Sequence, residues 1–209
     1  MDNQAKNLFE RALETKMIFG TPTNPNAVLF RNAVIIKTNF KGKEITITPK
    51  NGSRPFKKVG PRFTLVLTED MFNALCQEKG QCKYNIWQFD QENPDLKVYE
   101  IEVCIKMDSA KKQQPVIELI TKSHGKVNSE ALTAYNLGVL DDIESINTER
   151  IDMTLNPYDP NKIGMFTLWL RRMKFVQREV LDDISDGDDY WAELEKQIRN
   201  EDLPDPNED

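Results

Sequence analysis

The stretch from Arg31 to Phe63 combines dense positive charge with aromatic rings. It contains one acid, Glu44, and rings at Phe40 and Phe56 lie among the charges. Lysine and arginine can follow the phosphates of a single nucleic-acid strand, and rings can stack on its unpaired bases. A solvated basic hairpin with core phenylalanines would show the same pattern, and both interpretations stay open from this stretch alone. Its nine basic residues are Arg31, Lys37, Lys41, Lys43, Lys50, Arg54, Lys57, Lys58 and Arg62.

Residue types that carry out catalysis are scarce. His124 is the only histidine, and it lies in a Ser-His-Gly turn that favours a solvated side chain. The sequence has neither the glycine-rich lysine loop that holds nucleotide phosphates nor the Gly-x-Ser-x-Gly turn of a serine nucleophile. We therefore expect a protein that is not an enzyme and has no catalytic residues. A metal-dependent nuclease stays open, because acids gathered from distant strands leave no linear motif.

Metal-ligating residues lack a recognisable spacing. Cys76 and Cys82 have five residues between them and no second pair, and Cys104 follows separately. We expect reduced thiols that pack as small apolar groups. A calcium loop can be aligned to residues 182–193, but Ile184 then falls where an Asp or Asn ligand is needed. We expect no metal and no cofactor.

Charge is divided unevenly along the chain. Residues 181–209 hold twelve acids and two bases, a net charge of −10, whereas residues 1–180 hold 26 bases and 22 acids. A mildly basic body therefore carries a strongly acidic tail, which the net charge of −6 conceals. A segment of this composition cannot bury enough apolar surface to fold, so we expect the tail to be disordered.

Targeting signals are absent from the pattern of apolar residues. No apolar run approaches the roughly 20 residues that span a membrane. The first sixteen residues contain acids and no apolar signal region, so we expect neither secretion nor organelle import. An odd number of cysteines without a framework spacing fits a reducing cytoplasm.

Apolar periodicity predicts the elements that position these residues. Helical spacing predicts helices over 3–19 and 129–137, and a third that Thr68 caps and that ends before Gly80. Many short strands without a βαβ rhythm favour a mainly β barrel or sandwich. Trp169 alternates with Leu168 and Leu170, and we interpret it as a core residue. Alternation predicts strands over 27–40, 44–48, 63–67, 84–89, 98–107, 116–121, 149–155 and 164–180.

Two segments resemble a known family. Residues 29–43 (LFRNAVIIKTNFKGK), with the basic loop and RFTLVLTEDMFNAL (62–75) after them, resemble the N-terminal half of phage-encoded single-stranded-DNA-binding proteins. Residues 151–177 (IDMTLNPYDPNKIGMFTLWLRRMKFVQ) resemble their closing hairpin, in which a Pro-Tyr turn leads into a long final strand. The order and spacing of the segments and the acidic tail after them carry the resemblance.

The resemblance implies an OB-fold-like five-stranded barrel with extra strands, one or two short helices and an acidic tail. The chain is expected to have three regions: an N-terminal helix and linker (1–26), which the resemblance does not cover, an OB-fold domain (27–180) and the tail (181–209). The implied function is sequence-tolerant binding of single-stranded DNA in replication, recombination or repair. The implied partners are replication proteins such as a polymerase or helicase, reached through the tail, in the cytoplasm of a phage host. A homodimer stays open.

Candidate site residues come from the basic stretch and from the resemblance. The expected DNA contacts are Lys37, Phe40, Lys41, Lys43, Lys50, Arg54, Phe56, Lys57, Lys58, Arg62, Tyr158, Arg171, Arg172 and Lys174. The last three lie on the final strand and are expected to form a second wall of the same groove. The resemblance implies that the tail competes with DNA for this groove and recruits partners, through Asp182, Asp183, Asp186, Asp188, Asp189, Trp191, Glu208 and Asp209.

Other functions fit parts of the same pattern. A protein-interaction module could use the acidic tail to bind a basic partner or to mimic DNA, and the basic stretch would then be a solvated surface. RNA binding stays open as well, because nothing in the sequence reads a 2′-hydroxyl.

Overall fold

The structure is a computed structural model that describes residues 3–22, 24–49, 54–88, 95–107, 114–123, 126–142, 148–159 and 164–178. These residues form a mainly β protein, as the alternating sequence predicts. The helices among them are α1 (Asn3–Leu13), α2 (Glu69–Lys79) and a short 3₁₀-helix, η1 (Leu137–Asp142). The strands are β1 (Lys16–Thr21), β2 (Asn24–Arg31), β3 (Val34–Asn39), β4 (Ile45–Ile47), β5 (Phe56–Lys58), β6 (Arg62–Leu67), β7 (Gln81–Cys82), β8 (Asn85–Gln88), β9 (Lys97–Cys104), β10 (Val116–Ser123), β11 (Lys126–Leu132), β12 (Thr148–Tyr158) and β13 (Met165–Gln177).

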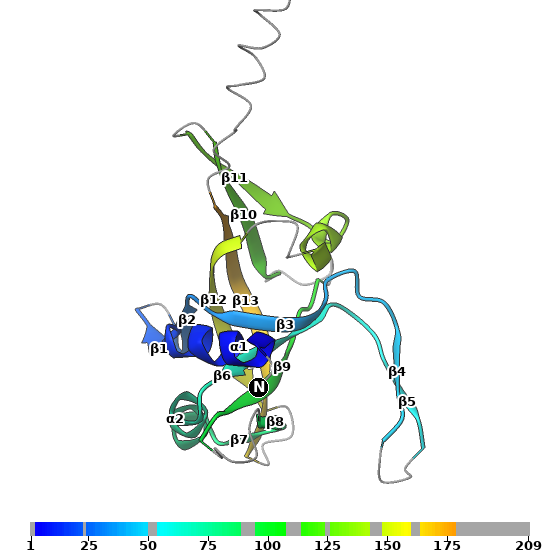
Figure 1. The fold of residues 1–209 in the computed structure, drawn as a ribbon. Coiled ribbons are helices and arrows are strands. Elements are labelled where there is room, and N and C mark those ends of the chain that lie inside the picture. The colour runs from blue at the N-terminus through cyan, green and yellow to red at the C-terminus, as the bar shows by residue number, and fades with distance from the viewer. Residues whose placement is uncertain are drawn as a thin grey trace, which may run out of the picture.

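Eleven of these strands belong to one sheet, whose main path is β1-β2-β12-β13-β9-β6-β3. Neighbours on the path are antiparallel except β9 and β13, which run parallel where Val103 and Cys104 pair with Leu168 and Trp169. The remaining strands extend the sheet: β10 pairs with β13 and β11, β7 with β13, and β8 with β9. Figure 1 shows the β10–β11 hairpin and the separate β4–β5 hairpin extending in different directions from the body.

The chain bends between β2 and β3. Strand β2 pairs with β12, and β3 pairs with β6 at the other end of the main sheet path. Asn32 has φ 54°, in the left-handed region that asparagine tolerates. Its backbone N–H donates to Asp152 Oδ1 at 3.1 Å, and the N–H of Ala33 donates to the carbonyl of Ile151 at 2.7 Å. Hydrogen bonds to β12 therefore hold the chain where it turns from β2, beside β12, to β3, beside β6.

The core lies beneath the alternating residues of β6, β9 and β13. On β9 the predicted apolar face is confirmed, since Tyr99, Ile101 and Val103 are buried. The prediction that the other face is wet fails at Glu100, which is only 4% exposed. Asn85 of β8 pairs with Glu100, and the Lys37 side chain contacts the Glu100 carboxylate. The polar face of β9 is therefore partly covered at this residue.

Helix α2 forms as its end signals predict. Thr68 is the N-cap, and its hydroxyl accepts a hydrogen bond from the backbone N–H of Met71 at 3.4 Å. Gly80 ends the helix with φ 95°, and its N–H donates to the carbonyl of Cys76 at 2.9 Å. Phe72 and Leu75 on the inner face are buried, which anchors the helix to the core.

Two predicted helices are wrong in extent or type. The helix predicted over 3–19 ends at Leu13, and β1 begins at Lys16, because residues 16–21 pair with β2. The helix predicted over 129–137 is instead strand β11 followed by η1, because residues 126–132 pair with β10. In both places pairing with a neighbouring strand overrides a weak helical pattern.

The β4–β5 hairpin was predicted only in part. Strand β4 falls within the expected strand 44–48, but β5 lies in the segment expected to be a loop. Ile45 pairs with Lys58 and Ile47 with Phe56, and this pair of strands forms its own sheet. We call residues 44–48 and 54–59 the arm, because they project from the body in Figure 1.

Within the described residues, no helix has the length and apolar character needed to cross a membrane.

Candidate nucleic-acid interface

A cleft separates the arm from the outer face of β3, β6 and β9. Its volume is about 410 Å³. Ile45 and Ile47 of the arm line one side. Lys58 also comes from the arm, and the body contributes, among others, Lys37, Arg62, Lys83, Tyr84, Glu100 and Glu102. We call this the arm cleft. It brings together Lys37, Lys58 and Arg62 from the predicted DNA contacts.

A second hollow continues from the arm cleft toward β13. It has a volume of about 500 Å³ and shares Lys58, Arg62 and Glu102 with the arm cleft. Lys106 and Trp169 line its far side, so we call it the tryptophan hollow. The shared residues make the two hollows one continuous surface across β6, β9 and β13.

Ion pairs occupy several of the predicted cations. Lys37 Nζ lies 2.5 Å from Glu100 Oε2, and Lys58 Nζ lies 2.6 Å from Glu102 Oε2. On the arm, Lys57 pairs with Glu44 at 2.7 Å. Lys37 and Lys58 neutralise the acids of β9, so the floor of the cleft does not repel a phosphate.

Arg62 has a structural role in addition to its charge. It is only 7% exposed, and its Nε and one terminal nitrogen donate to the carbonyl of Gly60 at 3.1 and 2.9 Å. These bonds shape the chain that leads from the arm into β6. Within this surface, Lys83 and Lys106 have no ion-pair partner among the described residues, so they are the cations available to a ligand.

Three aromatic side chains frame the surface. Tyr84 is 48% exposed in the arm cleft, where it packs against Phe72 and Tyr99. Trp169 lies in the tryptophan hollow, with Lys106 Nζ 4.0 Å from its ring centroid. Tyr158 is 51% exposed, and its ring meets the edge of Trp169 at a centroid distance of 5.2 Å. Tyr158 therefore lies at the surface beside Trp169, and its role in DNA binding stays a prediction.

The prediction that Phe40 stacks on a base is wrong for this structure. Phe40 is 1% exposed and lies between Phe63 and Phe175, with centroid distances of 5.9 Å to each ring. The carboxylate of Asp141 accepts hydrogen bonds from the backbone N–H groups of Phe40 (2.5 Å) and Lys41 (3.0 Å). These bonds from η1 hold the end of β3 so that the ring turns into the core.

Other predicted contacts lie outside the lining of the arm cleft. Phe56, on the arm, is 47% exposed. Lys41 and Lys43 are exposed in the turn after β3, and Arg54 is exposed on the arm. The structure brings none of these four residues into the lining given for the two hollows.

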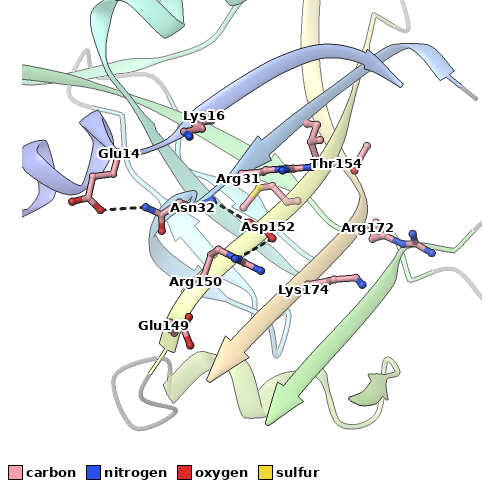
Figure 2. A pocket seen from close by; sticks show the side chains of 12 residues that line it. Glu14, Lys16, Arg31, Asn32, Glu149, Arg150, Asp152, Thr154, Arg172 and Lys174 are labelled. Carbon is pink, nitrogen blue, oxygen red and sulfur yellow. Dashed lines mark hydrogen bonds and ion pairs between the residues drawn. The ribbon is translucent and has the colours of Figure 1, made fainter. Parts of the chain in front are cut away.

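Strand β13 does not place its cations in the arm cleft. Arg172 and Lys174 line a separate polar hollow of about 870 Å³ on the outer side of β2, β12 and β13, shown in Figure 2. We call it the cationic basin. The predicted second wall of a single groove is therefore a surface of its own, and Lys174 pairs there with Glu118 at 3.4 Å. Arg171 lies between the two surfaces on β13.

A bulge in β13 sets the direction of these side chains. Leu155 pairs with Leu170 and Thr154 with Arg172, so Arg171 is the extra residue. Burial follows this shift, since Leu168 and Leu170 are buried before the bulge and Met173 and Phe175 after it. Trp169, Arg172 and Lys174 therefore share the outer face of one strand.

Four residues of the surface were not predicted: Lys83, Tyr84, Lys106 and Trp169. The interpretation of Trp169 as core is wrong, because the residue is only partly buried. The signal was present in the alternation, since Trp169 has the same parity as Met165 and Thr167, which are exposed, and opposite parity to Phe166 and Leu168. Lys83 and Tyr84 come to the surface beside the β8–β9 pairing, and Lys106 through the pairing of β9 with β13, so all three depend on contacts between distant parts of the chain.

The thiol that faces the tryptophan hollow is neutral. Burial raises the pKa of Cys104, and the charge of Glu102 raises it further. The three cysteines are free thiols, and the described residues contain no group of His, Cys, Asp or Glu side chains that could hold a metal ion.

Several predictions concern residues that the structure does not describe. Lys50 and the whole of the acidic tail lie outside the described residues, as does His124. The tail residues named for partner binding and competition are Asp182, Asp183, Asp186, Asp188, Asp189, Trp191, Glu208 and Asp209.

A scan against protein-family models finds no match for this chain, and searches of curated proteins and of solved structures find none.

Proposed function

We propose that this protein binds single-stranded DNA with little sequence preference, along the arm cleft and the tryptophan hollow. The observation that carries the proposal is the continuous surface that holds Lys83 beside Tyr84 in one hollow and Lys106 over the ring of Trp169 in the other. Cations can follow the phosphates while rings stack on bases of any kind. Nothing on this surface requires a particular base, because stacking is sequence-tolerant.

We further infer that the main strands form an OB-fold-like barrel. The path β3-β6-β9-β13-β12-β2 supports this, because β2 and β3 are consecutive and together act as one long first strand. In OB-folds the face of the second and third strands, between the connections of strands one to two and four to five, binds oligonucleotides. Here these would be β6 and β9, and residues of both strands line the two hollows beside the arm.

The acidic tail belongs to the proposal as a competitor. Its net charge of −10 is opposite in sign to the cations of the surface, so it would occupy part of the DNA path and leave when DNA binds. The same segment would recruit replication proteins. The protein would then act in DNA replication, recombination or repair, in the cytoplasm of a phage host.

Tryptophan fluorescence offers a direct test. The chain has three tryptophans. We expect titration with oligo(dT) to quench the emission of the unchanged protein, and Trp169→Phe to lose most of this quenching. Tyr84→Ala should weaken binding about tenfold, since a stacked base contributes about 1–3 kcal/mol. Tyr135→Ala is the matched control, because this ring is fully exposed and lines neither hollow.

A parallel titration with duplex DNA and single-stranded RNA would define the ligand class. Absence of binding to oligo(dT) at low salt would refute the proposal. One observation favours a protein-interaction module as the alternative: Lys37, Lys57 and Lys58 are already paired with acids of the chain. That alternative predicts no retention on single-stranded-DNA cellulose.

A further inference from the structure

We propose that the cationic basin is a second subsite for the DNA backbone, reached by a strand that leaves the tryptophan hollow and crosses β13. This inference rests on the proposed function and extends it from short to long DNA. It assigns a ligand to a surface on the other side of β13 from the arm cleft.

The charge of the basin is suited to phosphates. Its cations are Lys16, Arg31, Arg150, Arg172 and Lys174. Three of them, Lys16, Arg31 and Arg172, have no ion-pair partner among the described residues. Figure 2 shows Arg31, Arg172 and Lys174 arranged over β2 and β13. A ligand with spaced negative charges can therefore bind these cations without displacing an acid of the protein.

The acids of the basin already have partners. Glu14 accepts a hydrogen bond from the side-chain amide of Asn32 at 3.3 Å, and Glu149 pairs with Lys122 at 2.7 Å. Asp152 pairs with Arg150 at 3.1 Å and also accepts the N–H of Asn32. Glu14 keeps its charge because its partner is a neutral amide, but Lys16, Arg31 and Arg172 outnumber it, so the uncompensated charge of the hollow is positive.

Strand β13 runs from the tryptophan hollow to the basin and contributes Trp169 to the first and Arg172 and Lys174 to the second. The bulge at Arg171 keeps Trp169, Arg172 and Lys174 on the outer face. At about 3.3 Å per residue, Arg172 lies roughly 10 Å from Trp169 along the strand. A few nucleotides can cover this distance, so a base stacked on Trp169 would place the following phosphates near Arg172.

The lining of the basin indicates contacts with the backbone and not with bases. Among the described residues that line it, none is aromatic, and Leu29 and Met153 are the apolar ones. Arginine presents a planar set of donors that matches phosphate oxygens. Binding there should add affinity that depends on length and salt but not on sequence.

Substitutions of Lys16 and Arg31 test the end of the proposed DNA path that lies farthest from Trp169. They are opposite one another on β1 and β2, and both are exposed. The full chain with Lys16→Gln and Arg31→Gln together would be titrated with oligo(dT) of about 6 and about 25 nucleotides, which bracket the span of one OB-fold. Arg11→Gln on α1 is the control for loss of an exposed charge, and circular dichroism would verify the fold.

We expect the double variant to bind the short oligonucleotide within twofold of the unchanged chain. Its affinity for the long oligonucleotide should fall about tenfold to thirtyfold at 0.1 M salt, and the salt slope should decrease by about 1.4, as two lost phosphate contacts require. Unchanged affinity for the long oligonucleotide would overturn this inference and leave the proposed function intact. An equal loss for both lengths would also overturn it, because a distant subsite contributes nothing to the binding of the short oligonucleotide. If the unchanged chain binds neither, the proposed function and this inference both fail.

Discussion

Lys37 reaches the buried carboxylate of Glu100 from a strained position in β3. Lys37 has φ 50°, and the pairing of β3 with β6 shifts register between Ile36 and Asn39. Its Nζ lies 2.5 Å from Glu100 Oε2, whose side chain is 4% exposed, although the lysine itself is 61% exposed. The bulge therefore turns the residue predicted as a DNA contact toward an acid that needs a counter-ion.

Removal of this lysine should destabilise the protein. We expect Lys37→Ala to lower the free energy of unfolding by about 1–3 kcal/mol, because a buried carboxylate loses its charged donor. The double variant with Lys37→Ala and Glu100→Gln should regain part of the lost free energy of unfolding, since an amide does not need a counter-ion. Urea denaturation of the two single variants and the double variant gives the coupling energy. A coupling near zero would show that water already screens the pair.

Phe40 and Phe56 form a matched pair of ring substitutions, one buried and one exposed. Phe40→Ala should lower the free energy of unfolding by about 3–5 kcal/mol, because it leaves a cavity between Phe63 and Phe175. Phe56→Ala, on the arm, should change stability by no more than about 0.5 kcal/mol. Thermal denaturation compares the two directly. A stable Phe40→Ala variant with reduced DNA affinity would restore the prediction that Phe40 stacks on bases.

The sequence predicted elements well where local signals and burial agree. Thr68 and Gly80 define the ends of α2 through backbone hydrogen bonds that involve only nearby residues. The alternation of Ile101 and Val103 on β9 shows directly which face is buried. These features depend on residues that are close in the sequence, so capping residues and the spacing of apolar residues predict them.

The positions of the site residues depend on contacts between distant parts of the chain, which the periodicity of apolar residues cannot predict. Phe40 is buried because Asp141, about a hundred residues away, binds its backbone. Arg172 points into the basin because the register of β12 and β13 shifts by one residue at Arg171. A single inserted residue reverses the face of every later side chain, and the pairing with β12 shows that this residue is Arg171.

Glu69 links the first turn of α2 to β9 and should give the protein an acid-sensitive contact. Hydrogen bonds from Lys97 and then from the Tyr99 hydroxyl lower the pKa of Glu69 below its ordinary value of 4.5. A lowered pKa in the folded state means that this contact contributes stability above pH 4.5 and loses it as the pH falls through the folded value.

The test compares melting temperatures between pH 7 and pH 3. Glu69→Gln should melt below the unchanged protein at pH 7, and the difference should shrink as the pH falls from 4.5 through the lower pKa of the folded state, below which the glutamate itself is neutral. Asp70→Asn is the control, since this neighbouring acid is exposed and no ion pair is formed by it among the described residues. A difference in melting temperature that stays the same from pH 7 to pH 3 would show that the charge of Glu69 does not stabilise this contact.

Cys82 should resist alkylation in the folded protein. Burial raises the pKa of its thiol to about 12, and the residue is 6% exposed. At pH 8 only about one thiol in ten thousand would then be the reactive thiolate. We expect iodoacetamide to label Cys82 much more slowly in buffer than in urea, as peptide mass spectrometry can measure. Rapid labelling in buffer would show that β7 opens.

The acidic tail should weaken DNA binding through its charge. Removal of residues 181–209 deletes a net charge of −10, so we expect affinity for oligo(dT) to rise, with the largest gain at low salt. Replacement of the tail acids by their amides in a full-length chain is the matched control for length. It should reproduce the gain if charge is responsible, because the chain then keeps its size and loses only its negative charges. Fluorescence anisotropy between 50 mM and 300 mM salt would measure both variants. Equal affinities for the unchanged chain and both variants at every salt concentration would show that the tail does not compete for the DNA surface.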